Sequence, residues 1–108
     1  MEREIVFSKD VEQYLDELMH LLHEKGYFGF PDSAKSYVDH LVSFIEQQVG
    51  IRSGKNAPDF FKPFGKNLKY IIFHANKRTS WYILYQERNN IYLIRHITNN
   101  HVAAQFFQ

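Results

Sequence analysis

The stretch that decides the fold spans residues 81–97 and reads WYILYQERNNIYLIRHI. Its two halves are rich in Trp, Tyr and Ile, which are residue types that favour β-strands. Between them lies the tetrapeptide ERNN at 87–90, and asparagine tolerates the positive φ angles that tight hairpin turns need. The stretch therefore predicts a β-hairpin with strands at 81–86 and 91–97.

The residues on both sides of this hairpin extend the pattern. Residues 68–74 form a third β-prone run, joined to the hairpin by a basic turn at 75–78. We interpret residues 51–63, which hold one glycine, two prolines and two lysines, as a loop. After the hairpin, we expect residues 101–107 to form one or two helical turns, capped by Asn99 or Asn100.

The first half of the chain has the period of α-helices. Residues 3–7 are a short β-prone segment, and apolar side chains then recur at helical spacing from Val11 to Leu22 and from Ala34 to Val49. Each run has N-cap candidates before it and a glycine after it. These are Ser8, Asp10 and Gly26 for the first helix, and Asp32, Ser33 and Gly50 for the second.

The order of these elements predicts an α+β fold. It consists of an N-terminal strand, a two-helix hairpin and then a three-stranded antiparallel sheet, to which the first strand adds a fourth if it pairs. The helical hairpin is expected to cover one face of the sheet. The other face would then be the surface available for function.

Length and composition limit the class of protein. The 108 residues suit a single domain over residues 1–108, and 44% hydrophobic residues is too apolar for a disordered chain. The absence of cysteine excludes disulfide frameworks, thiolate zinc sites and Cys nucleophiles. No apolar run reaches the roughly 20 residues of a membrane span, and the first residues lack the apolar core of a signal peptide. We therefore expect a cytoplasmic protein that does not enter a membrane.

The net charge of +1 conceals two regions of opposite charge. Residues 1–50 carry four basic and ten acidic side chains, whereas residues 51–78 carry seven basic side chains and one acidic one. A division of this kind suggests that one part of the molecule meets an anionic partner.

The sequence resembles the RelE/ParE superfamily, the toxins of bacterial type II toxin–antitoxin modules. The resemblance covers nearly the whole chain and rests on the order of the elements and on several short runs. The central run, Trp81 to Tyr85, looks like the family's aromatic-Arg-apolar-apolar-Tyr strand. The others are Ile5-Val6-Phe7-Ser8, the loop with Pro58, the turn at Asn89-Asn90, the strand to Ile97 and the ending Asn99-Asn100-His101.

The resemblance implies a toxin that a cognate antitoxin protein neutralises. Members of the family either cleave mRNA in the ribosomal A site or inhibit DNA gyrase, so the expected partners are the ribosome and mRNA, or gyrase. We favour ribosome-dependent mRNA cleavage. The alternative is a non-enzymatic, protein-binding toxin of ParE type or an inactive member, because Tyr82 stands where the ribonuclease members carry arginine.

Cleavage of RNA through the 2′-hydroxyl needs a proton acceptor, a proton donor and cations for the phosphate. His96 and His101 are the candidates for proton transfer, and Arg78 is the main candidate for holding the phosphate. The alternative interpretation is that His96 stacks on aromatic rings of the sheet and that His101 caps a helix or lies on the surface. Strict alternation would place Tyr92, Ile94 and His96 on one face of the last strand.

Further cations form a candidate surface for nucleic acid or antitoxin, because they alternate with aromatic residues. They are Arg52, Lys55, Lys62, Lys66, Lys69, Lys77 and Arg95. The simpler interpretation of residues 52–78 is a solvated loop whose aromatic rings close the end of the core. No cofactor motif is present, and we interpret His20 and His23 as surface histidines rather than metal ligands.

Overall fold

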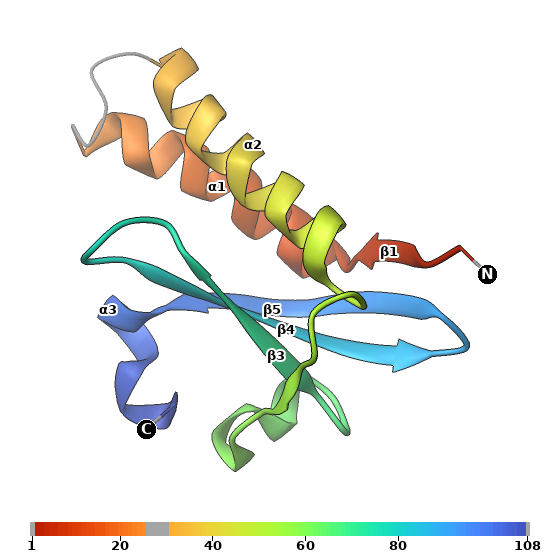
Figure 1. The fold of residues 1–108 in the computed structure, drawn as a ribbon. Helices are drawn as coiled ribbons and strands as arrows, with labels where there is room; N and C mark the ends of the chain where they lie inside the picture. The colour runs from red at the N-terminus through yellow and green to blue at the C-terminus, as the bar shows by residue number, and fades with distance from the viewer. Residues whose placement is uncertain (1, 26–30, 108) are drawn as a thin grey trace.

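The structure, a computed structural model, describes residues 2–25 and 31–107, and the side chains of residues 31 and 32 are not described. The elements form three layers, with α1 and α2 on one side of a sheet and short helical segments on the other (Figure 1). In chain order they are β1 (Glu4–Phe7), α1 (Lys9–Glu24), α2 (Pro31–Gln48), β2 (Lys55–Asn56), η1 (Asp59–Phe64), β3 (Lys69–His74), β4 (Ser80–Arg88), β5 (Ile91–Asn99), α3 (Asn100–Ala103) and η2 (Ala104–Phe107).

The α+β class is confirmed, but the sheet is five-stranded and mixed rather than three-stranded and antiparallel. The strand order is β1-β5-β4-β3-β2, and β1 runs parallel to β5 while the other neighbours are antiparallel. The parallel pair joins strands from opposite ends of the chain, a pairing that local patterns do not reveal. The strand β2 has two residues, which is too short for an alternating signal.

The helices begin and end close to the expected positions. The hydroxyl of Ser8 accepts a hydrogen bond from the Val11 N–H at 3.2 Å, so Ser8 rather than Asp10 is the N-cap of α1. The second helix already begins at Pro31, so the N-cap expected at Asp32 or Ser33 is wrong. Proline suits the first helical position because its missing N–H has no partner there in any case. The expected end of α1 at Gly26 lies outside the described residues.

The helical hairpin buries its apolar stripes on one face of the sheet, which we call the hairpin face. Its core is mainly aliphatic, and Leu41, Ile45, Ile83 and Ile94 are completely buried. Gly50 closes α2 with a φ of +87°, and an added Cβ would lie 2.7 Å from the ring of Tyr92. Only glycine meets both conditions at low cost.

The β4–β5 hairpin has the turn that the sequence predicts. Asn89 and Asn90 have φ angles of +51° and +67°, which are the signs of a type I′ turn. Further along, Leu84 pairs with His96 and Tyr85 pairs with Ile94, so Arg95 is an extra residue in a β-bulge. The bulge reverses the alternation after Ile94. The predicted shared face of Ile94 and His96 is therefore wrong.

The second face of the sheet is covered rather than free. A second core lies there, built mainly from aromatic rings of η1, β3, β4 and the C-terminal segment 100–107. Its buried members and the residues packed on them are Phe61, Leu68, Tyr70, Tyr82, Leu84 and Ala103, with Ala57, Phe64, Ile72, Phe106 and Phe107. We call this side of the sheet the aromatic face. Because these side chains cover it, the prediction that this face is open for function is wrong.

Candidate functional site

The strongest site lies at one end of the sheet, where the β3–β4 turn meets the start of α3. His74 Nδ1 lies 2.9 Å from the Ser80 hydroxyl, and His101 Nε2 lies 3.0 Å from the Thr79 hydroxyl. Both imidazoles are exposed, so the two histidine–hydroxyl pairs are open to solvent. We call this group of side chains the histidine corner.

Asparagine side chains hold the two segments of the histidine corner together. Asn76 Oδ1 accepts the N–H groups of Arg78 and Thr79 at 2.9 and 3.0 Å, which shapes the turn. Asn100 accepts the Ser80 N–H at 2.8 Å and donates to the Arg78 carbonyl at 2.9 Å. Because Asn100 bridges the turn to α3, the two histidines are held on one rigid frame.

The start of α3 is fixed by its own cap. Asn99 Oδ1 accepts the N–H groups of His101 and Val102 at 2.9 and 3.3 Å. This confirms one of the two caps that the sequence allowed, and it places His101 in the first turn of the helix. The cap fixes the backbone at His101, and the contact of its Nε2 with the Thr79 hydroxyl sets the direction of the ring, which a proton-transfer group requires.

Positive charge lies beside the histidines. Lys77 and Arg78 are exposed in the same turn, and within residues 2–25 and 31–107 neither side chain forms an ion pair. Of the three predicted catalytic residues, Arg78 and His101 thus lie in neighbouring segments, because Asn100 donates to the backbone carbonyl of Arg78 and the His101 ring contacts Thr79. Two exposed cations with no ion-pair partner among the described residues are available for a phosphate group.

A hollow of about 200 Å³ extends the histidine corner along the edge of β3. The strand β2 pairs with Lys69 and Tyr70 of β3. Beyond these two residues, the outer edge of β3 has no neighbouring strand among the described residues. Arg52, Lys55 and His74 line the hollow. Two cations from the predicted basic stretch are therefore placed next to the corner.

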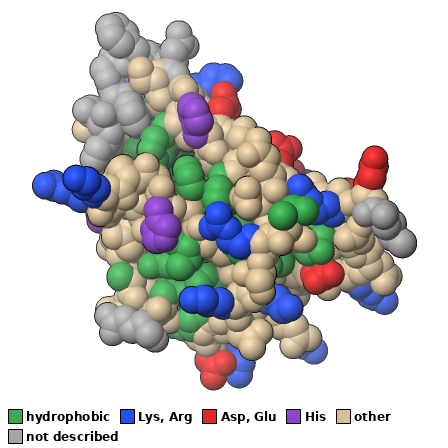
Figure 2. Space-filling model, viewed as in Figure 1, with side chains coloured by type: hydrophobic (Ala, Val, Ile, Leu, Met, Phe, Trp, Pro, Cys, Tyr) green, Lys and Arg blue, Asp and Glu red, His purple; other side chains and the backbone are tan. Residues whose placement is uncertain are grey.

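Figure 2 shows this side of the molecule, where Lys and Arg side chains are interleaved with hydrophobic ones over the sheet.

The third predicted catalytic residue, His96, lies elsewhere. Its ring stacks on Phe64 with centroids 3.8 Å apart and lies 5.8 Å from the ring of Phe61. Burial lowers the pKa of His96 below its ordinary value, because the charged form loses its hydration. His96 is therefore a stacked ring, as the alternative interpretation expected, but the rings that it contacts belong to η1 rather than to the sheet.

The remaining predicted cations are divided among separate places. Arg52 donates to the Ile72 carbonyl at 3.1 Å, and Arg95 Nε donates to the Phe64 carbonyl at 2.8 Å. Lys62 lies 3.6 Å from Asp59 in an exposed ion pair, a kind that contributes little stability. Lys55, Lys66 and Lys69 are exposed. Arg52 and Arg95 thus have structural roles in addition to their charge.

The sequence analysis did not identify His74 or Ser80 as site residues. The run from His74 to Ser80 contained a usable signal. A histidine at the end of one strand lies opposite the hydroxyl that follows the turn in a short hairpin. His74 and Ser80 are in fact direct cross-strand neighbours in the β3–β4 pair. The turn that was predicted at 75–78 already implied that pairing.

Tyr82, where the resemblance described above led us to expect an arginine, is buried on the aromatic face. Its ring stacks on Phe107 with centroids 3.9 Å apart and an angle of 8° between the planes. The exposed fraction of Tyr82 is 9%, which leaves no room for a substrate at this position in the described structure. Tyr82 is therefore part of the packed aromatic face rather than of an open surface.

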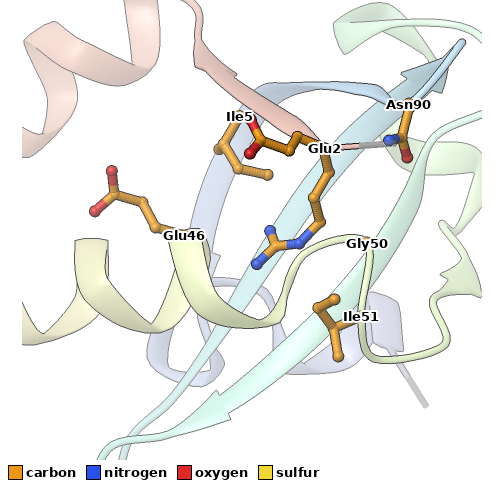
Figure 3. Close-up of a pocket in the computed structure, with 7 residues that line it drawn as sticks. Glu2, Ile5, Glu46, Gly50, Ile51 and Asn90 are labelled. Atoms are coloured by element: carbon orange, nitrogen blue, oxygen red, sulfur yellow. The ribbon is translucent and has the colours of Figure 1, made fainter.

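Another hollow, of about 680 Å³, lies at the opposite end of the sheet from the histidine corner, and Figure 3 shows the residues that line it. It is shallow and lined by β1, the end of α2 and the β4–β5 turn. Arg3 lies in it, but its guanidinium is already bound to the carbonyls of Val49 and Gln47 at 2.8 and 3.3 Å. These contacts satisfy the C-terminal carbonyls of α2. The hollow therefore has a structural explanation and is a weaker candidate.

Comparisons of the chain with protein-family models, curated proteins and solved structures found no match. Among the described residues, no group of three or more histidine and acidic side chains is placed to hold a metal ion. In the same part of the chain, no helix has the length and apolar character that crossing a membrane requires.

Proposed function

We propose that this chain is the toxin of a bacterial type II toxin–antitoxin module, of the RelE/ParE kind that it resembles, and that it inhibits translation by cleaving mRNA on the ribosome. The observation that carries the proposal is the histidine corner, where the exposed imidazoles of His74 at the end of β3 and His101 in α3 flank the turn that carries Lys77 and Arg78. This is the minimum set of groups for cleavage of RNA without a metal.

In the proposed reaction, one imidazole of the pair His74 and His101 takes the proton of the ribose 2′-hydroxyl. The 2′-oxygen then attacks the adjacent phosphorus, and the bond from phosphorus to the 5′-oxygen breaks. The other imidazole, in its protonated form, gives a proton to that leaving oxygen. The products are a 2′,3′-cyclic phosphate and a 5′-hydroxyl, and all protons are accounted for.

The cations and hydroxyls of the corner support this chemistry. Lys77 and Arg78 would neutralise the phosphate as negative charge grows on its oxygens. The hydroxyls of Thr79 and Ser80 fix the orientation of the imidazoles, since each forms a hydrogen bond to one ring. His96 has no part in this proposal because its ring is stacked within the aromatic face.

The partners follow from the same proposal. A cognate antitoxin would cover the basic side of the molecule, which includes the hollow of Arg52, Lys55 and His74. An acidic segment suits this surface by charge, and its binding would raise the apparent stability of the toxin by linkage. Because the target is the ribosome, the proposed location is the cytoplasm.

One observation favours the second candidate function, a protein-binding toxin of ParE type that inhibits DNA gyrase. The position of the family's arginine is Tyr82, and its ring is covered by Phe107. A protein without that arginine, and with a closed sheet face, could act by binding alone.

Induced expression followed by primer extension on cellular mRNA separates the two functions. The first predicts cuts in mRNA that disappear in His101→Ala and His74→Ala but persist in His40→Ala. His40 is the matched control because it is an exposed histidine on α2, away from the corner. Growth arrest with intact mRNA and damaged DNA would instead establish the second function.

A further inference from the structure

Within residues 2–25 and 31–107, the ring of Phe60 is both exposed and stacked on another ring. Phe60 is 56% exposed, whereas its neighbour Phe61 is 2% exposed. Phe60 stacks on Phe106 with centroids 3.7 Å apart and 11° between the planes. Phe106 therefore covers one face of the Phe60 ring, and the other face is exposed to solvent.

The ring of Phe60 is supported by a continuous set of aromatic contacts. Phe61 meets Phe60 edge-to-face at 5.1 Å and meets Phe106 in the same way at 6.0 Å. Phe61 also lies 5.1 Å from Phe107, whose ring stacks on Tyr82. Phe60 is thus the outermost ring of the aromatic face, and its orientation is set by rings beneath it.

An exposed, fixed ring loses little entropy when a flat ligand stacks on it. Nucleobases are such ligands, because every base offers a π-face and stacks without regard to its identity. Proteins that bind single-stranded nucleic acid combine such aromatic platforms with cations that follow the phosphate backbone.

Positive charge lies on the same side of the sheet as Phe60. Lys62 is in the same 3-10 helix, and its 75% exposed side chain can turn to solvent from its exposed pair with Asp59 at 3.6 Å. Lys55 is exposed and pairs across β2 and β3 with Tyr70, whose ring lies 4.8 Å from Phe107. The segment that contains these residues carries most of the molecule's excess positive charge. The platform is therefore complementary in charge to a polyanion.

The C-terminal segment connects this platform to the histidine corner. It begins at His101, beside the β3–β4 turn, and reaches Phe106 on the aromatic face. In Figure 1 it runs from α3 along the side of the sheet opposite α1 and α2. At the rise of helical residues, the five residue steps from His101 to Phe106 span on the order of 10 Å. One strand of RNA can therefore reach both places.

We propose that the exposed face of Phe60, stacked on Phe106, binds a nucleobase of single-stranded RNA next to the nucleotides held at the histidine corner. This inference rests on the proposed function for the choice of RNA as the ligand. It adds a specific contact, since stacking supplies affinity that is independent of base sequence. It also gives the aromatic face a role beyond stability.

The test measures binding of a short, unstructured oligouridylate labelled with fluorescein, by fluorescence anisotropy at low salt. Phe60→Ala is expected to weaken binding by about 5- to 100-fold, the range found when a stacking side chain is removed. Phe60→Trp keeps a flat ring and is expected to retain binding, with the new indole fluorescence quenched by the bound base. Lys62→Ala is expected to lower the salt slope by about one.

Val102→Ala is the matched control, because Val102 is a still more exposed apolar residue, at 72%, on the C-terminal segment. Its binding should equal that of the unchanged protein. Equal binding by Phe60→Ala and the unchanged protein would overturn the inference. The inference would also be overturned if sedimentation showed that the unchanged protein self-associates and that Phe60→Ala does not. The ring would then be an interface between two copies.

Failure of this inference is distinguishable from failure of the proposed function. If the unchanged chain cuts mRNA in cells and Phe60→Ala binds the oligouridylate normally, the platform is wrong and the toxin proposal stands. If neither cutting nor oligouridylate binding occurs, both are wrong. His101→Ala should lose cutting while it keeps oligouridylate binding, since it leaves Phe60 in place.

Discussion

The two faces of the sheet are covered by different means. The hairpin face is covered by helices of 16 and 18 residues, and its fully buried side chains are mostly aliphatic. The aromatic face is covered by 3-10 and α segments of four to six residues, whose rings stack on one another. Long helices carry their own hydrogen bonds, whereas short segments depend on side-chain contacts for their position.

The two coverings are expected to differ in stability, and the candidate site lies on the side of the less stable one. The hairpin face has the features of a stable core, with β4 and β5 at its centre. The aromatic face is expected to open locally at lower free energy, because its elements are short and border solvent. The histidine corner lies at the junction of β5 and α3, where the C-terminal segment that covers the aromatic face begins.

The largest expected effect is on the hairpin face. Leu41→Ala removes a completely buried side chain of α2 and should lower the free energy of unfolding by about 2–5 kcal/mol. Urea denaturation followed by circular dichroism measures this loss, with all elements unfolding together. If the loss were below that of the next variant, the hairpin face would not be the main core.

A smaller effect is expected on the aromatic face. Phe107→Ala removes a partly buried ring that stacks on Tyr82, and should cost about 1–3 kcal/mol from lost area and stacking. Hydrogen exchange should speed up most in residues 100–107 and least in α1 and α2. An equal increase in all elements would contradict the idea that this face opens locally.

The smallest expected effect is a dependence of stability on pH that comes from His96. Burial lowers its pKa in the folded state, so the unfolded chain takes up a proton first as the pH falls below the ordinary value of 6.5. The free energy of unfolding should therefore decrease below that pH and be unaffected by this group above it.

His96→Phe should keep the stack on Phe64 and lose this part of the pH dependence. The measurement is urea denaturation at a series of pH values, with the exposed His40→Phe as control. An unchanged pH slope in His96→Phe would show that His96 is not desolvated by its position on the aromatic face.

Much of the fold followed from local chemistry in the sequence. The turn at Asn89-Asn90 and the cap at Asn99 were predicted because each depends on one residue type at one place. The bulge at Arg95 was not, because one extra residue in a strand leaves the composition of the strand unchanged. The parallel partner of β1 lies almost a whole chain length away, and no local pattern specifies it.

The candidate site was predicted in part for the same reasons. His101 and Arg78 were identified by chemical type, and the structure brings them together through Asn100. His96 was selected by the same criterion, but the bulge turns it into the aromatic face. His74 was overlooked because its importance comes from Ser80 across the hairpin rather than from its own neighbours in sequence.

Cleavage of RNA at the histidine corner is best tested by the chemical structure of the ends of the cut RNA. Purified protein is added to translating ribosomes on a defined mRNA, and the new 3′ termini are analysed. The proposed reaction at the histidine corner predicts 2′,3′-cyclic phosphate termini, with the rate reduced by about 100-fold or more in His74→Ala and in His101→Ala. Intact mRNA with the unchanged protein, or cutting that persists at full rate in both variants, would contradict it.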